Sequence, residues 1–182
     1  MKRLILLHLL LALVIETCAE PYIIIGDLKL VRVPSAVRTD GLREYIIEGD
    51  TVERWTRLAS VRVFPNQRDP KAFLSAVAAG VRKTDPNARH QFYQNKRTKN
   101  ITLDFMVFPP RGEPRRYDAE WNLMRAEYQK GRGLVVYQYA MRLYRSGTEG
   151  AKLINTEREK MLDPFQQASF DEKEEPSEAL GK

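Results

Sequence analysis

The sequence predicts an α+β fold, a largely antiparallel β-sheet packed with two main helices. Several short segments alternate apolar and polar residues with a period of two, which is typical of half-buried strands. Two longer segments instead have apolar residues at helical spacing. At 182 residues the chain is long enough to form one domain with a full core.

The clearest strand signal lies in Leu134–Tyr144, where β-branched and aromatic residues share one parity while Gln138 and Arg142 fall on the other. The preceding Gln129–Gly133 supplies glycines that can adopt the positive φ of a tight hairpin. Tyr117–Tyr128 also alternates and is the predicted partner strand. A helix within that partner segment is the alternative interpretation.

Further strands are predicted on both sides of this hairpin. The first two would form an N-terminal hairpin, and the last two would flank a polar loop. The predicted strands are Tyr22–Ile25, Leu28–Val33, Arg43–Ile47, Leu58–Phe64, Arg89–Gln94 and Ile101–Phe108.

Two helices are predicted from their end signals. Asp69 can accept hydrogen bonds from the free amides of a first turn, Pro70 suits the first helical position, and Pro86 ends the segment. The second helix is expected over Thr148–Leu162, with Pro164 stopping it. The core-facing stripe of the first helix is expected to be Ala72, Phe73, Ala76, Val77 and Val81.

The N-terminus has the pattern of a secretory signal peptide over residues 1–19. A basic start precedes the apolar run Leu4–Ile15, and Thr17-Cys18-Ala19 offers a cleavage site after Ala19. A transmembrane anchor and lipid attachment at Cys18 are the alternatives. The expected mature protein begins at Glu20, has no transmembrane anchor and is exported, either to the periplasm or out of the cell.

The chain is basic, with a formal net charge of +6, whereas its last residues are acidic. A single domain is expected over residues 20–170, followed by an acidic disordered tail over 171–182 that holds five acids and two lysines. The basic excess lies in the folded body and favours anionic surroundings such as a polyanionic envelope component. It is equally an ordinary means of keeping a protein soluble.

Catalytic and metal-binding motifs are missing from the sequence. Cleavage after Ala19 would remove Cys18 and leave His90 as the single histidine, with no nucleophile elbow around any serine. No zinc or calcium spacing is present, so neither a metal nor a cofactor is expected. A pair of carboxylates acting on a glycoside stays open, because such a pair is defined in space.

Two basic loops are the candidate anion-binding or partner-binding sites, since clustered arginines bind phosphate and carboxylate groups. Their alternative is ordinary solvated loops. The candidate residues are Lys96, Arg97 and Lys99 in one loop and Arg111, Arg115 and Arg116 in the other.

Four aromatic residues are expected in the core, and a ligand pocket is the alternative for them. They are Trp55, Trp121, Tyr137 and Tyr139.

Three sequence pieces together resemble a group of uncharacterised secreted or periplasmic bacterial proteins and, more loosely, the PsbP-like α/β/α sandwich. The resemblance implies a fold and an extracytoplasmic setting, and it carries no catalytic residue. The pieces are Glu44-Tyr45 with Gly49 and Trp55-Thr56, then Trp121-Asn122-Leu123 with Arg125, then Tyr137-Gln138-Tyr139-Ala140 with Arg142.

The sequence therefore favours a non-catalytic extracytoplasmic binding or accessory protein. It would act through an envelope protein or an anionic envelope component, and nucleic acid is not an expected partner. The alternative is a small-ligand carrier or an enzyme with a pocket between sheet and helix. A pocket with convergent polar groups would favour this alternative, whereas a filled core and a flat basic face would favour the first.

Overall fold

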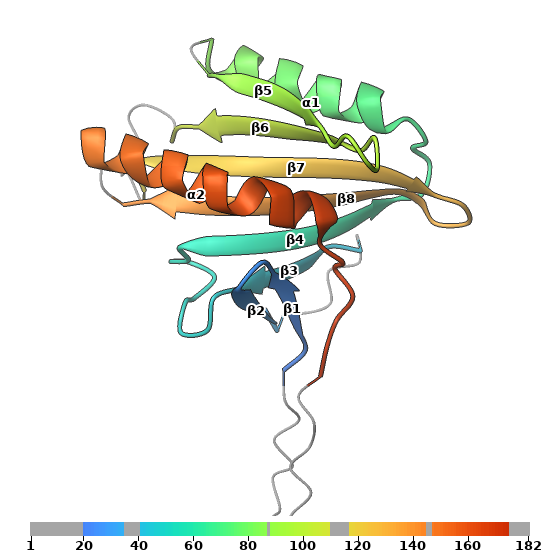
Figure 1. Cartoon of the computed structure of the whole chain (residues 1–182), viewed down its shortest axis with the longest axis horizontal. Helices are drawn as coiled ribbons and strands as arrows, with labels where there is room; N and C mark the ends of the chain where they lie inside the picture. Colours follow the sequence, from blue (N-terminus) through green and yellow to red (C-terminus); the bar gives the residue numbers. More distant parts are fainter. Residues whose placement is uncertain (1–19, 35–40, 87, 110–116, 145–146, 175–182) are drawn as a thin grey trace, which may run out of the picture.

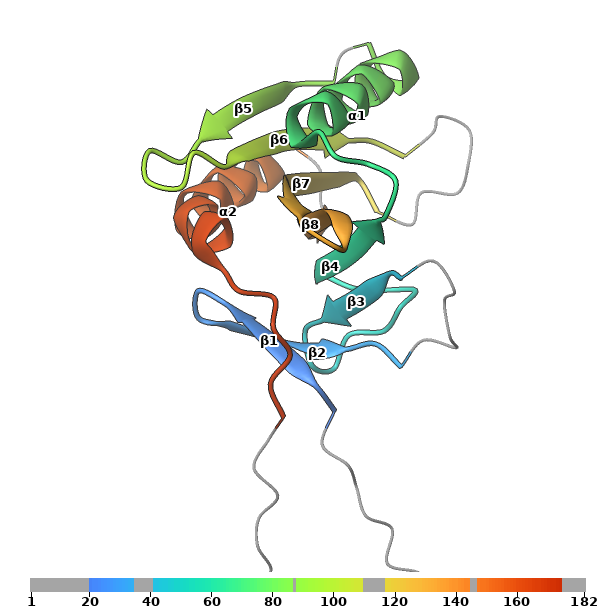
Figure 2. The same ribbon diagram turned by 90° about the vertical axis from the view of Figure 1, so that its right-hand side faces the viewer.

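The computed structural model describes residues 20–34, 41–86, 88–109, 117–144 and 147–174. These residues form an eight-stranded antiparallel sheet of order β1-β2-β3-β4-β8-β7-β6-β5, with one helix on each face (Figures 1 and 2). The predicted α+β fold is confirmed. The elements are β1 (Tyr22–Ile25), β2 (Leu28–Arg32), β3 (Arg43–Ile46), β4 (Arg57–Phe64), α1 (Pro70–Thr84), β5 (His90–Gln94), β6 (Ile101–Val107), β7 (Ala119–Gln129), β8 (Gly133–Leu143) and α2 (Thr148–Gln167).

The predicted central hairpin is the pair β7–β8, so the helical alternative for its first segment was wrong. The two strands run antiparallel along their whole length, from Ala119↔Leu143 to Gln129↔Gly133. Gly133 has φ +93°, and a Cβ on it would lie 2.5 Å from the backbone oxygen of Phe64. Glycine is therefore required at this turn both by its conformation and by the close approach of β4.

The period of two in β8 separates two cores. Tyr137, Tyr139 and Met141 point to the face covered by α2, whereas Leu134 and Val136 point to the face covered by α1. The larger core lies under α2, where Tyr139 is fully buried. Figure 2 shows that α1 lies over the β5 side of the sheet, so the opposite half of its face is not covered by that helix.

Helix α1 begins and ends where the sequence predicts. The side chain of Asp69 accepts a hydrogen bond from the amide of Ala72 at 2.9 Å, and Thr84 is the last helical residue. The predicted core-facing stripe was partly wrong. Leu74 and Ala78 are buried and Phe73, Val77 and Val81 pack beside them, whereas Ala72 and Ala76 are exposed. The packed face of the helix therefore lies one residue further along the chain than predicted.

Helix α2 continues to Gln167 and contains Pro164, so the predicted stop at Pro164 was wrong. A proline inside a helix costs about 3 kcal/mol through its missing amide hydrogen and its ring. Two features offset that cost. Phe165 is fully buried in the larger core, and Arg125 of β7 donates hydrogen bonds to the carbonyls of Gln166 and Ala168 beyond it.

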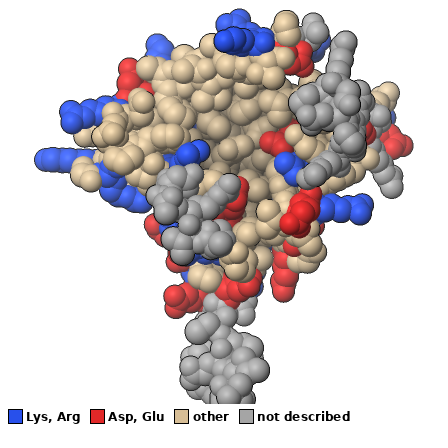
Figure 3. Space-filling model, turned by 180° about the vertical axis from the view of Figure 1, so that it is seen from behind, with Lys and Arg blue, Asp and Glu red and all other residues tan. Residues whose placement is uncertain are grey.

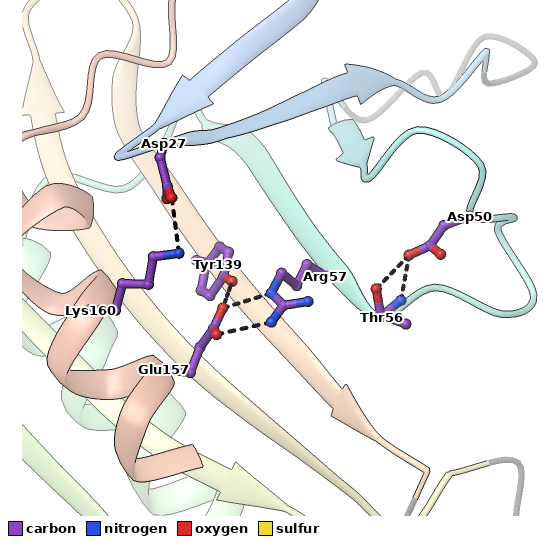
Figure 4. A network of polar contacts seen from close by, with 7 residues as sticks. All are labelled: Asp27, Asp50, Thr56, Arg57, Tyr139, Glu157 and Lys160. Carbon is purple, nitrogen blue, oxygen red and sulfur yellow. Dashed lines mark hydrogen bonds and ion pairs between the residues drawn. The ribbon is translucent and has the colours of Figure 1, made fainter. Parts of the chain in front are cut away.

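A polar network fixes α2 to the sheet (Figure 4). The Glu157 carboxylate accepts hydrogen bonds from the hydroxyl of Tyr139 and from Arg57 Nε and Nη2, the latter two at 2.7 and 3.0 Å. A more exposed ion pair, Lys160 with Asp27 at 3.0 Å, joins the same helix to the β1–β2 turn. Burial raises the pKa of the Glu157 carboxyl, but the hydrogen bonds from Arg57 and Tyr139 outweigh it and hold this pKa below its ordinary value.

The lowered pKa of Glu157 predicts a pH-dependent contribution to stability. A carboxyl whose pKa is lower in the folded protein stabilises it above the unfolded pKa of about 4.5 and loses that contribution as pH falls through the folded value. The Glu157→Gln variant should therefore unfold with a weaker dependence on pH below about pH 4.5 than the wild type. Urea unfolding at a series of pH values measures this, and identical profiles would contradict it.

The segment after α2 lies along the sheet edge. Lys173 forms an antiparallel bridge with Tyr22, and Glu172 accepts a hydrogen bond from the Tyr45 hydroxyl at 2.8 Å. The first residues of the predicted disordered tail thus have defined partners, which its acidic composition did not reveal. Residues 175–182 lie outside the described residues.

The predicted signal peptide, residues 1–19, also lies outside the described residues. Neither α1 nor α2, the helices of the described part of the chain, has the length and apolar character needed to span a bilayer.

Candidate functional site

Of the two basic loops predicted as sites, the structure describes one. Lys96, Arg97 and Lys99 lie in the β5–β6 turn, where Arg97 Nη2 donates to Gln167 Oε1 at 3.3 Å. Lys99 adopts a φ of +62°, as the turn requires. Arg111, Arg115 and Arg116 lie outside the described residues, so the second basic loop stays a prediction.

The remaining sequence candidates lie in different places. His90 opens β5 and packs edge-on against Phe92, with ring centroids 6.0 Å apart. Trp121 and Tyr139 are fully buried under α2, as expected of core residues. Within the described ranges, no three His, Cys, Asp or Glu side chains gather as they would around a metal ion.

A groove in the α1 face of the sheet is the candidate site, called here the sheet groove. Its volume is about 420 Å³, within the range of small-ligand sites. It begins where Phe73 of α1 packs on Phe64 of β4 and runs across β3, β4, β8 and β7. Figure 3 shows this face from behind, hollowed below α1. Its lining is Leu42, Glu44, Trp55, Leu58, Ser60, Arg62, Phe64, Phe73, Glu120, Met124, Val136, Gln138, Ala140 and Arg142.

Strand register brings the polar residues of the sheet groove together. Glu44 of β3 pairs with Ser60 of β4, and Ser60 pairs with Gln138 of β8, so the three form one row across the sheet. Neighbouring strands are about 4.8 Å apart, and side chains in one row therefore lie within reach of a single small molecule. This row lies on the part of the sheet face that α1 leaves open, where polar side chains can contact a ligand or solvent.

A buried amide just outside the lining, Asn122, holds the amide of Gln138 in the sheet groove. Gln138 Nε2 donates a hydrogen bond to Asn122 Oδ1 at 2.6 Å, and Asn122 Nδ2 donates to the Glu120 carbonyl at 3.3 Å. Asn122 is 1 % exposed, and Ser60 nearby is also buried. The bond to Asn122 holds the Gln138 amide, which has both donor and acceptor atoms, in one orientation at the groove.

A stacked arginine forms the far end of the groove. The Arg142 guanidinium lies 3.8 Å from the ring centroid of Trp55 and 4.4 Å from that of Tyr117. Its Nε donates to Glu120 Oε2 at 3.0 Å. Stacking and ion pairing together hold the planar guanidinium in one orientation.

The loop between β3 and β4 places Trp55 in the groove. Asp50 accepts hydrogen bonds from the Thr56 amide and hydroxyl at 2.6 and 2.9 Å (Figure 4). The Tyr144 hydroxyl donates to the Trp55 carbonyl at 2.7 Å. Gly49, with φ +89°, allows the turn that begins this loop. These hydrogen bonds fix the peptide between Trp55 and Thr56 and so position Trp55 at the groove.

The charges that line the sheet groove balance. The lining contains two glutamates, Glu44 and Glu120, and two arginines, Arg62 and Arg142, so its formal net charge is zero. Hydroxyl, amide, carboxylate and guanidinium groups together offer both donors and acceptors. This arrangement suits an uncharged ligand with several hydrogen-bonding groups.

Several residues of the sheet groove already stand out in the sequence, but no sequence pattern groups them into one site. Gln138 and Arg142 form the polar parity of β8, and Glu44, Trp55 and Asn122 belong to the three pieces of the resemblance. Asn122 is just outside the groove lining, and the other four line it. The signal that would have found the site is the series of polar residues on the second face of three neighbouring strands.

A protein-family model matches residues 35–170 of the chain. The match includes β3 to β8, both helices and the whole lining of the sheet groove. No curated protein and no solved structure matches the chain.

Proposed function

The chain belongs to the uncharacterised family of that model, and we propose that it is a non-catalytic binding protein that holds a small uncharged polar ligand in the sheet groove. The observation that carries the proposal is the row of polar side chains on a sheet face that α1 leaves open. Ser60 in this row is only 7 % exposed although no helix covers it, so its hydroxyl has lost most of its hydration. A ligand that forms hydrogen bonds with these groups accounts for their presence.

The geometry favours ligand binding over the accessory role that the sequence placed first. A pocket with convergent polar groups was the feature expected of a ligand carrier, and the sheet groove has it. Two rigid devices orient its polar groups: the Gln138–Asn122 amide pair and the stacked Arg142. Pre-oriented groups lower the ordering cost of binding.

Three finer inferences stay predictions beside this proposal. They are export to the periplasm or beyond the cell, action on an anionic envelope component, and likeness to the PsbP-like fold. The basic character of the chain supports the second of them. Export is tested by the intact mass of the protein recovered from outside the cytoplasm, which should correspond to a start at Glu20.

The proposal is tested by following the side-chain amide signals of the groove by NMR. Mono- and disaccharides and dipeptide amides would be titrated, since they are small, uncharged and rich in hydrogen-bonding groups. At least one class should shift the NH₂ signals of Asn122 and Gln138 and the indole signal of Trp55. Gln138→Leu should weaken that binding about tenfold, as expected for a lost hydrogen bond that leaves partners unpaired.

The control for this titration is Gln91→Leu, which alters an exposed glutamine of β5 outside the groove. This variant should bind like the wild type. The proposal fails if no compound moves the three groove signals, or if the shifted signals map to other parts of the molecule.

A further inference from the structure

Four arginines line a second pocket, on the opposite face of the sheet from the groove, called here the arginine pocket. Arg43 comes from β3, Arg97 from the β5–β6 turn, Arg125 from β7 and Arg132 from the β7–β8 turn. The pocket has a volume of about 380 Å³, and the C-terminal end of α2 with residues 168–171 forms its wall. Arginines from four separate segments therefore meet at one place.

The register explains how these side chains share a face. Arg43 pairs with Val61, Val61 with Tyr137, and Tyr137 with Arg125, so these residues form one row across four strands. The Arg43 and Arg125 ends of the row are about 14 Å apart at strand spacing, and long arginine side chains reach well into that gap. The other two arginines, Arg97 and Arg132, come from the β5–β6 and β7–β8 turns.

Arg125 is the buried element of the pocket. It is 4 % exposed, and its guanidinium lies 4.6 Å from the ring centroid of Tyr137. Its Nε is buried without a hydrogen-bond partner among the described residues, although Glu127 Oε1 lies 3.4 Å away, within ion-pair distance. Burial lowers the pKa of this guanidinium, whereas the charges of Glu127 and Tyr137 act in the opposite direction.

The pocket has an excess of positive charge. Its four arginines face two acids, Glu127 and Asp171. The Asn100 amide donates to Glu127 Oε1 at 2.7 Å and so shares that carboxylate with Arg125. Asp171 accepts a hydrogen bond from the Ser169 hydroxyl. Two positive charges are left without a counterpart in the lining, unlike the balanced sheet groove.

The rim of the pocket already accepts an acidic group of this chain. Glu172 lies 3.1 Å from Arg32 Nη1 and 3.8 Å from Arg43 Nη1, and it also accepts the Tyr45 hydroxyl. Arg43 therefore contacts a carboxylate here. Arg97 and Arg132, in the same lining, instead donate to the uncharged amide oxygens of Gln167 and Gln129.

We propose that the arginine pocket is a second binding site, specific for a phosphate group. Arginine binds phosphate oxygens through two parallel N–H bonds, which suits a cluster of three accessible guanidiniums above a buried fourth. The site lies on the other face of the sheet from the groove, and its ligand is anionic where the ligand of the groove is uncharged. This second site goes beyond the proposed function, and its test does not depend on whether the sheet groove binds a ligand.

The test is a titration of the chain from Glu20 onward with inorganic phosphate, at constant ionic strength against chloride. Phosphate should shift the backbone amide signals of Arg97, Thr98 and Arg132. The Arg97→Gln/Arg132→Gln double variant should bind phosphate about tenfold more weakly, as expected for lost hydrogen bonds between charged groups. Glu172→Gln, which frees Arg43 without removing the bridge of Lys173, should bind it about threefold more tightly.

The matched control is Arg68→Gln/Arg82→Gln, which removes the same charge from two exposed arginines outside the pocket. It should bind phosphate like the wild type, as should Gln138→Leu in the sheet groove. Vesicles of phosphatidylglycerol, compared with phosphatidylcholine, distinguish the source of the phosphate. Retention that the Arg97/Arg132 variant loses identifies a lipid headgroup, whereas phosphate binding without retention identifies a soluble phosphate compound.

Two results would overturn the proposal. One is equal weakening of phosphate binding in the pocket variant and the control variant, which would mean that net charge alone acts. The other is the absence of both phosphate-induced shifts and vesicle retention in the wild type.

Discussion

Replacing Tyr139 by alanine should lower the free energy of unfolding by about 3–5 kcal/mol, the range for large aromatic truncations in cores. Tyr139 is fully buried, and its ring packs edge-on against Trp121 with centroids 6.1 Å apart. The substitution also removes the hydroxyl that donates to Glu157, so α2 loses one of its anchors to the sheet. Urea denaturation monitored by tryptophan fluorescence measures the change.

Two comparison variants separate the parts of this effect. Tyr139→Phe keeps the packing and should cost about 1–3 kcal/mol, the range for a buried acceptor that loses its partner. Tyr128→Ala removes a tyrosine of the same hairpin that is 47 % exposed, and it should cost less than about 1 kcal/mol. A loss below 1 kcal/mol for Tyr139→Ala would place that residue outside the core and contradict the structure.

The Arg125→Met variant should lose about 2–3 kcal/mol of stability, because two carbonyls at the end of α2 lose their charged donor. Arg125 Nη1 donates to Gln166 at 2.7 Å and Nη2 to Ala168 at 3.0 Å. Methionine preserves most of the apolar stem, so packing against Tyr137 changes little. Relief of the cost of burying a cation reduces the loss, which keeps it below the sum of two charged hydrogen bonds.

Hydrogen exchange shows where the Arg125→Met effect arises. The amides of the last turn of α2, after Pro164, should exchange faster, while those of α1 keep their protection. The matched variant Arg132→Met, at an exposed turn position, should change stability by no more than about 0.5 kcal/mol. Unchanged exchange at the end of α2 would show that Arg125 does not hold this helix end.

Local patterns predicted most of the architecture because each strand is half buried. The parity of Tyr137 and Tyr139 correctly predicted a buried strand face, which lies under α2, and the Asp69-Pro70 pair correctly placed the start of α1. The end of α2 was missed for a non-local reason. Pro164 reads as a helix stop in sequence, but the helix continues because Arg125, on a distant strand, binds the carbonyls beyond it.

Both candidate sites depend on strand order, which no local pattern contains. Glu44 and Gln138 are neighbours across β4 only because β3, β4 and β8 are adjacent in the sheet. Likewise, sequence proximity groups Arg97 with Lys96 and Lys99 as one predicted anion-binding loop. Its neighbours in the arginine pocket are Arg43 and Arg132, from other segments. Charge clustering in sequence thus identified one member of the site and none of its partners.

Native mass spectrometry of the chain purified from its natural host tests the sheet groove most directly, with the Asn122→Leu/Gln138→Leu variant as comparison. Replacing both amides of a pair by apolar residues of similar size is nearly neutral for stability, so the variant should unfold within about 1 kcal/mol of the wild type. We predict a bound small molecule on the wild type that is missing from the variant. The same adduct on both proteins, or none on the wild type, would contradict a ligand site in the groove.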